Sequence, residues 1–175
     1  MRLFFAVWPD AEVVRQFAQA ASQIPLQDPG RLVNPGDYHL TLAFIGEVGA
    51  ASLFVLRQIG AAQRASCCNI AFDGVEHWPK PGVIVSTARE IPSALEALSA
   101  QLYEALRQQR LVTLSPARPL RAHVTLARKV SQAPVLPMMS SFIWPVNGFG
   151  LVSTNTSGVQ SVYTVLDTWP LLYER

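Results

Sequence analysis

Strand-like runs and stretches with helical periodicity alternate along the chain. Residues 2–8 (RLFFAVW) are dense in aromatic and aliphatic side chains, and a Pro-Asp pair ends this run. Between residues 13 and 24 apolar side chains recur at three- and four-residue intervals, which predicts an amphipathic helix. A turn-rich stretch, 25–37, then leads to a second strand at 38–46. The chain is therefore expected to begin with a strand, a helix, a long loop and a strand.

The same order of elements returns in the second half. The further elements expected are a helix at 51–65, a strand at 69–78, a strand at 82–88, a helix at 91–106, a strand at 122–128, and strands at 148–154 and 161–169 around a polar turn. The helix at 91–106 is expected to have Pro92 near its start and a capping box from Ser93 to Glu96. The first strands of the two series lie about 80 residues apart, and an internal duplication is the simplest account.

This pattern predicts one α+β domain, residues 1–175, made of two pseudo-symmetric lobes that share a cleft. The first repeat covers about 1–78 and the second about 82–130, with closing strands between 140 and 169. An apolar fraction of 50% is enough to bury a substantial core in a domain of 175 residues.

Charge and apolar run length limit the classes of function. Charged residues make up 15% of the chain and the net charge is +2, so any basic surface for nucleic acid must be local. Despite a mean hydropathy of +0.22, about 18 apolar residues never follow one another, and the first apolar run ends before a secretory segment forms. We therefore expect a soluble, cytoplasmic protein. The adjacent pair Cys67-Cys68 lacks the spacing of a zinc or redox motif.

Two tetrapeptides stand out. Residues 39–42 read HLTL and residues 123–126 read HVTL, in a chain with three histidines. Chance would place two such matches on three histidines in roughly one case in ten thousand, the kind of false-positive estimate that a motif requires. The low chance of coincidence indicates that the repeat is meaningful.

Each tetrapeptide can present an imidazole and a hydroxyl to one side of a strand. Side chains alternate along a strand, so His39 and Thr41 share a face, as do His123 and Thr125. If the two repeats face one another, both pairs surround one centre. One histidine can then act as acid and the other as base, while the hydroxyls hold an anion. A phosphodiester would use all four groups, and this scheme needs no metal or cofactor.

With these residues in view, the chain resembles the 2H phosphoesterase superfamily, which is named for paired H-x-T motifs. Within it, the chain is similar to the bacterial RNA 2',3'-cyclic phosphodiesterases, also called 2'-5' RNA ligases. The segments RLFFAVWP, YHLTLAFIGEV, AHVTLARKV and VYTVLDTWPL carry this resemblance over essentially the whole length. It implies a bilobal fold in which two antiparallel sheets flank a central cleft, with helices on the outside.

The resemblance also implies an activity and individual roles. The expected reaction is hydrolysis of an RNA or nucleotide 2',3'-cyclic phosphate to the 2'-phosphomonoester by a monomer, with 2'-5' ligation as a secondary activity. By analogy, His39 is the proton donor to the leaving 3'-oxygen and His123 is the proton acceptor that activates water. Thr41 and Thr125 correspond to the hydroxyls that hold the phosphate.

Four further residues are candidates for substrate binding. Arg128 follows the second motif, but a regular strand points it away from His123 and only a bulge or strand end would bring it back. Arg121 is either a phosphate contact or a rim charge. Core packing is the favoured interpretation of Phe5, and stacking on a base is the alternative. Tyr163 lies in the closing strand with its role undecided.

Other functions stay open at this point. A binding module that holds an RNA end without chemistry would use the same His and Thr side chains. Another member of the superfamily would act on a different small cyclic phosphate. A mononuclear metal enzyme is disfavoured because the two motifs offer a poor zinc set. Substrate choice is expected to depend on loops near 25–37 and 130–147. The third histidine, His77, lacks a threonine partner and is interpreted as a surface or turn residue.

Overall fold

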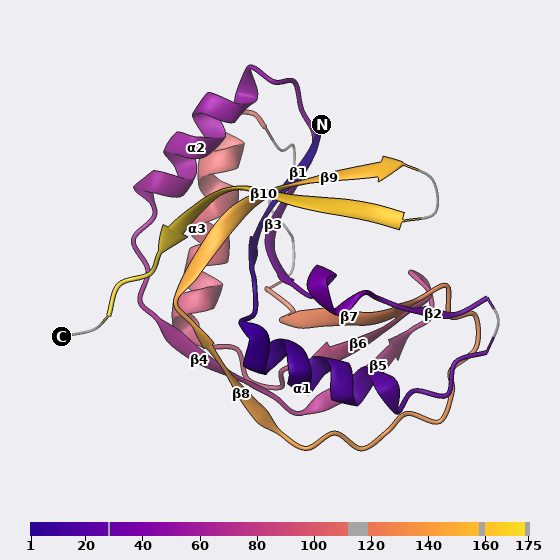
Figure 1. Cartoon of the computed structure of the whole chain (residues 1–175). Coiled ribbons are helices and arrows are strands. Elements are labelled where there is room, and N and C mark those ends of the chain that lie inside the picture. Colours follow the sequence, from indigo (N-terminus) through magenta and orange to yellow (C-terminus); the bar gives the residue numbers. More distant parts are fainter. Residues whose placement is uncertain (28, 112–118, 158–159, 174–175) are drawn as a thin grey trace.

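Two four-stranded antiparallel sheets and three α-helices make up most of the molecule in the computed structural model, which describes residues 1–27, 29–111, 119–157 and 160–173 (Figure 1). The elements are β1 (Arg2–Val7), α1 (Ala11–Ser22), β2 (Arg31–Leu32), the short 3-10 helix η1 (Pro35–Asp37), β3 (Leu40–Glu47), α2 (Ser52–Ala62), β4 (Cys68–Phe72), β5 (Gly74–Trp78), β6 (Val83–Thr87), α3 (Ser93–Gln108), β7 (His123–Arg128), β8 (Phe142–Val146), β9 (Gly148–Ser157) and β10 (Gln160–Pro170).

The two sheets have the strand orders β10-β9-β1-β3 and β2-β7-β6-β5, and β4 pairs with β8 in a separate two-stranded sheet. Each large sheet holds one of the two motif strands, β3 in the first and β7 in the second. This confirms the expected α+β class with antiparallel sheets. The division of the chain into two contiguous repeats stays a prediction.

The helices pack on the sheets in a crossed fashion. Helix α3, from the second half of the chain, packs against β3 of the first sheet, and α1, from the first half, packs against β7 of the second. Helices α2 and α3 lie side by side on the first sheet, whereas α1 runs along the second (Figure 1). Their buried faces carry the periodic apolar residues read from the sequence, such as Val13 and Phe17 in α1 or Leu98 and Leu102 in α3.

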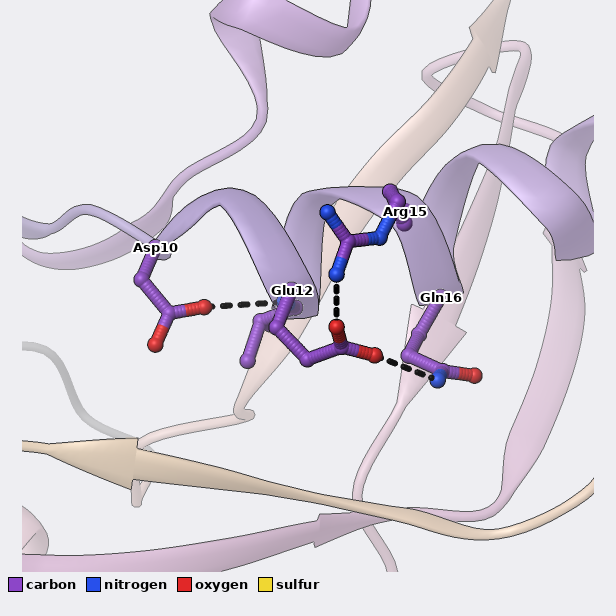
Figure 2. A network of polar contacts seen from close by, with 5 residues as sticks. Asp10, Glu12, Arg15 and Gln16 are labelled. Atoms are coloured by element: carbon purple, nitrogen blue, oxygen red, sulfur yellow. Dashed lines mark hydrogen bonds and ion pairs between the residues drawn. The ribbon is translucent and has the colours of Figure 1, made fainter.

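Helix α1 begins at Ala11, two residues before the apolar pattern that predicts it, with Asp10 as its N-cap. The Asp10 carboxylate accepts a hydrogen bond of 2.9 Å from the backbone N–H of Val13, which satisfies a free amide of the first turn. Glu12 contacts Arg15 and accepts a hydrogen bond from Gln16 on the exposed side (Figure 2). Figure 2 also shows that the second carboxylate oxygen of Asp10 points away from the helix.

The capping box predicted for α3 is wrong. Pro92 is the N-cap residue, and Ser93 is the first residue inside the helix, so no side chain caps the first turn. A capping box requires the serine hydroxyl at the N-cap itself, one position earlier than Ser93 stands.

Several strands differ from the sequence prediction. The expected strand 69–78 is two strands, β4 and β5, which separate at Asp73 and join different sheets. Strand β8 lies within the range 140–169 expected for the closing strands, although the sequence pattern predicts no separate strand there because of Pro145 and nearby polar residues. The stretch 25–37 contains β2 and η1. Of the polar turn expected between the last two strands, residues 158–159 lie outside the described residues.

The buried side chains form one large core and one small cluster. The large core joins both sheets to the helices and includes Phe5, Phe17 and Trp144. The small cluster, Phe4, Ala6 and Val152, lies on the other face of the first sheet, with Trp8 and Tyr163 packed against it. Strand β1 is therefore buried on both faces, and its small-cluster face is the one that meets the motif histidine.

Candidate active site

His39 and His123 are held by matching backbone contacts. The Nδ1 of His39 lies 2.7 Å from the carbonyl oxygen of Asp37, and the Nδ1 of His123 lies 2.7 Å from that of Arg121. A carbonyl oxygen only accepts, so both Nδ1 atoms carry the proton. Neither Nε2 is hydrogen-bonded to another residue that the structure describes. Each neutral imidazole therefore presents a free Nε2 lone pair, and each imidazolium would present an N–H there.

Both motif strands bulge at the same position. In the pairing of β3 with β1, Thr41 and Ala43 oppose consecutive residues, and in the pairing of β7 with β6, Thr125 and Ala127 do the same. The leucine that follows each threonine is thus the extra residue of a β-bulge. One extra residue reverses the alternation beyond it, so the second residue after the bulge returns to the histidine face.

This bulge explains how Arg128 can lie on the same strand face as His123, although a regular strand would point it away. Leu126 and Ala127 are both fully buried, and Arg128 is half-buried on the side of His123 and Thr125. Its positive charge acts on both His39 and His123, as their pKa values show below. Arg128 therefore belongs to the same centre as the two motifs.

A small cavity of about 70 Å³ lies between the two sheets. Arg128 and Arg31 line it from the second sheet, Tyr163 lines it from β10 of the first, and Asp37 is also part of its wall. The Tyr163 ring lies 5.0 Å from that of His39, so the cavity adjoins the first motif. The hydroxyls of Thr41 and Thr125 form no hydrogen bond to other residues in the described part of the chain, which leaves them available to an anion.

Aromatic rings hold both imidazoles in place. Trp8 stacks on His39 with ring centroids 5.0 Å apart and planes inclined by 13°, and Phe4 lies against the same imidazole at 5.1 Å. On the opposite sheet, Trp78 lies 4.6 Å from His123. The sequence reading missed Trp8, Phe4 and Trp78, although Trp8 and Phe4 have the even spacing of residues on one strand face.

The expectation that Phe5 contacts substrate is wrong. Phe5 is fully buried in the large core, where it packs against Phe149 and Trp169. Strand alternation turns Phe4 toward His39 and Phe5 away from it, and the packing of α2 on β9 and β10 makes the Phe5 side the core side. The core alternative considered for Phe5 is the correct one.

Arg121 lies at the rim near His123. Its guanidinium lies over the Trp78 ring at 4.4 Å and makes an ion pair of 3.2 Å with Glu76, whose carboxylate also accepts a hydrogen bond from the Trp78 indole. The backbone carbonyl of Arg121 orients His123, as described above, and its side chain leaves the guanidinium exposed.

Burial and positive charge lower the pKa of both histidines. The pKa of His39 is lowered from 6.5 to about 4, mainly because burial disfavours the imidazolium, with smaller contributions from the charges of Arg128 and His123; the hydrogen bond to the Asp37 carbonyl opposes these. The pKa of His123 is also lowered, again chiefly by burial and then by Arg121 and Arg128, whereas Glu76 raises it. An anion bound between the imidazoles would raise both pKa values.

The lowered pKa of His39 predicts a loss of stability in acid. In the pH range from 6.5 down to about 4 the unfolded chain binds a proton at this residue and the folded protein does not, so the stability present above pH 6.5 falls as the pH decreases. We expect the free energy of unfolding to drop by roughly 3 kcal/mol more in the wild type than in His39→Ala over this range. Urea titrations at pH 7 and pH 4 measure the difference, and an equal drop in both proteins would contradict it.

The third histidine and the cysteines lie apart from this centre. His77 is in strand β5, not in a turn, and its Nε2 lies 3.2 Å from the carbonyl oxygen of Val130. Cys67 and Cys68 are free and half-buried. Among the described residues, no three His, Cys, Asp or Glu side chains are grouped so that they could hold a metal ion. No helix in the described part of the chain is long and apolar enough to cross a membrane.

Known proteins are similar to this chain in sequence and in fold. The family model described as LigT like Phosphoesterase matches residues 7–85. The RNA 2',3'-cyclic phosphodiesterase of Escherichia coli is 32% identical over 175 residues, which cover 97% of this chain and 96% of that protein. The chain belongs to the LigT-like phosphoesterase family. A second relative with the same printed function, from Thermus thermophilus, is 30% identical over the full chain and 92% of its own length.

Two solved structures match all or nearly all of the chain. TT0787 of Thermus thermophilus matches with a TM-score of 0.88 and 28% identity, covering 100% of both chains. Escherichia coli LigT complexed with 3'-AMP matches with a TM-score of 0.86 and 29% identity, covering 97% of both chains. The bilobal fold expected from the resemblance is thereby confirmed.

Proposed function

We propose that this LigT-like phosphoesterase hydrolyses RNA or nucleotide 2',3'-cyclic phosphates to 2'-phosphomonoesters with His39 and His123 as acid and base. The observation that carries the proposal is a pair of imidazoles on facing sheets whose Nε2 atoms are not hydrogen-bonded to other described residues. Each imidazole shares its strand face with a threonine hydroxyl, and the positive charge of Arg128 acts on both. The printed function of the relatives from Escherichia coli and Thermus thermophilus supports the substrate class.

In the proposed reaction the cyclic phosphate lies between the two Nε2 atoms. The neutral Nε2 of His123 takes a proton from water, and the water oxygen forms a bond to phosphorus. The bond from phosphorus to O3' breaks, and the Nε2–H of His39 gives its proton to O3'. Thr41 and Thr125 donate to the non-bridging oxygens, where charge develops. The roles of the two histidines follow family analogy, since the backbone contact at each Nδ1 is the same.

The charge of the bound substrate would supply the donor with its proton. His39 is neutral in the free protein near pH 7, and the negative charge of the bound phosphodiester favours its imidazolium form. One proton is then taken up with the substrate and delivered to the leaving oxygen. A 5'-hydroxyl in place of water gives a 2'-5' linkage by the same steps, which is the proposed secondary ligase activity.

All of these groups come from one chain, so we propose that the protein acts as a monomer. No step requires a metal ion, because charge on the phosphate is met by the Thr hydroxyls and Arg128. The test is incubation of the purified protein with a 2',3'-cyclic nucleotide and with RNA that ends in one, with and without EDTA. Turnover that persists with EDTA supports the proposal, and the absence of turnover on every cyclic phosphate favours the non-catalytic binding module instead.

Replacing Arg128 is expected to weaken substrate binding more than the chemical step. Arg128→Met removes a charge that faces the phosphate in both the ground state and the transition state, so we expect KM to rise about tenfold with a smaller change in kcat. Because Arg128 lowers the pKa of both histidines, the maximum of kcat/KM should also move to higher pH.

Arg107→Met is a matched control for this prediction. Arg107 lies on the exposed side of α3 and pairs with Glu104, so its removal costs a charge without touching the site. Steady-state kinetics between pH 5 and pH 9 compare the two variants. Equal KM values for wild type and Arg128→Met would show that Arg128 does not contact the substrate.

A further inference from the structure

A second and larger cavity adjoins the first sheet next to the stacked tryptophan. Its volume is about 440 Å³, within the range of about 300–1,000 Å³ that small-molecule ligands occupy. Trp8, Asp10, Asn147, Gly150, Val165 and Thr168 are among its lining residues. Its lining residues come from the start of α1, the beginning of β9 and the end of β10.

This cavity shares a sheet face with the candidate active site. Ala6 and Trp8 line it, and both belong to or pack on the small cluster that carries Phe4 and Tyr163 against His39. Trp8 contacts the imidazole of His39 through its stacked ring and also forms part of the cavity wall. The indole thus stands between the reacting centre and the cavity.

The lining suits an uncharged planar group that can form hydrogen bonds. Among the described residues of the wall, Asp10 alone is charged, and a carboxylate repels a phosphate. The free oxygen of Asp10 and the side chains of Asn147 and Thr168 are not hydrogen-bonded to other described residues. Gly150 adds no side chain to the lining. The Trp8 ring could stack on the face of a nucleobase, and the amide, hydroxyl and carboxylate groups could hydrogen-bond to its polar edge.

We propose that this cavity binds the base of a nucleotide upstream of the cyclic phosphate, which makes oligoribonucleotides rather than cyclic mononucleotides the preferred substrate class. The inference rests on the proposed function. We place the nucleoside that carries the cyclic phosphate on the His39 side of Trp8, because its sugar is bonded directly to the reacting group. A base beyond the indole therefore belongs to a preceding nucleotide, in line with the way single strands stack on aromatic side chains.

Three substrates separate base recognition from phosphate contact. They are a 2',3'-cyclic mononucleotide, a dinucleotide that ends in the same cyclic nucleotide, and that dinucleotide without its first base. We expect kcat/KM of the wild type to be about tenfold higher for the intact dinucleotide than for the mononucleotide, and removal of the base to lose most of this gain. Equal values for the intact and abasic dinucleotides would overturn the inference, because only a base can use the cavity.

A bulky side chain in the cavity provides the second test. Thr168 is exposed and lines the cavity, so Thr168→Trp should lower the ratio of the dinucleotide value to the mononucleotide value by about fivefold or more. Thr164→Trp is the matched control, because Thr164 lies on the same strand and is also exposed. The irregular pairing between Val165 and Asp167 turns Thr164 to the other sheet face. Circular dichroism checks the fold of both variants.

If Thr168→Trp does not fold, Asn147→Ala takes its place and should lower the same ratio about twofold to threefold by removal of one hydrogen-bonding group. An unchanged ratio in a folded cavity variant would overturn the inference and leave the proposed hydrolysis intact. If the wild type hydrolyses none of the three substrates, the proposed function fails and this inference fails with it.

Discussion

Replacing either His39 or His123 by alanine should lower kcat/KM for a 2',3'-cyclic nucleotide by about 10² to 10⁴-fold, the contribution usual for a general acid or base. Neither Nε2 is hydrogen-bonded to another described residue, and the proposed reaction needs one to accept a proton and the other to donate one. Because the two act in one step, the double variant should lose little more than either single one.

His77→Ala is the control for these two variants. This third histidine lies on β5 with its Nε2 against the Val130 carbonyl, so its loss removes an imidazole without removing a reacting group. We expect its kcat/KM to stay close to that of the wild type. A folded His39→Ala, His123→Ala double variant with full activity would contradict the mechanism outright.

Removing both threonine hydroxyls should produce the second large effect. Thr41→Val and Thr125→Val keep the shape of the side chain and remove a donor to a non-bridging oxygen, so each should lower kcat by about 10- to 100-fold and the pair by more. The loss should fall on kcat more than on KM, because the charge on these oxygens grows in the transition state.

Thr164→Val serves as the control, since Thr164 is exposed on β10 and points away from the site. Steady-state kinetics on a 2',3'-cyclic nucleotide separate kcat from KM for all of these variants. If the Thr41→Val, Thr125→Val pair raised KM alone, the hydroxyls would bind the ground state without assisting the reaction.

The sequence was sufficient to predict that each motif histidine shares a strand face with its threonine, because strand alternation is a local property. His39 and Thr41 share a face whatever the rest of the chain does, and the same holds for His123 and Thr125. The bulges at Leu42 and Leu126 are not local in this sense, since they arise from pairing with β1 and β6. The return of Arg128 to the histidine face could therefore only be stated as one of two alternatives.

The choice between Phe4 and Phe5 shows a second limit. Both are apolar residues in a strand that is buried on both faces, so alternation says that they diverge but not which one meets His39. The packing of helices on the first sheet decides it, and this includes α3, which comes from the other half of the chain. Strands β4 and β5 look like one strand in the sequence, but pairing with β8 and with β6 places them in different sheets.

The phosphate position in the product tests the central claim most directly. RNA that ends in a 2',3'-cyclic phosphate is incubated with the wild type and with His77→Ala, His39→Ala and His123→Ala, and the phosphorus resonances of the products are assigned by NMR. The account predicts a 2'-phosphomonoester from the first two proteins, with EDTA present, and unreacted cyclic phosphate from the last two. A 3'-phosphomonoester, or equal turnover by all four proteins, would contradict it.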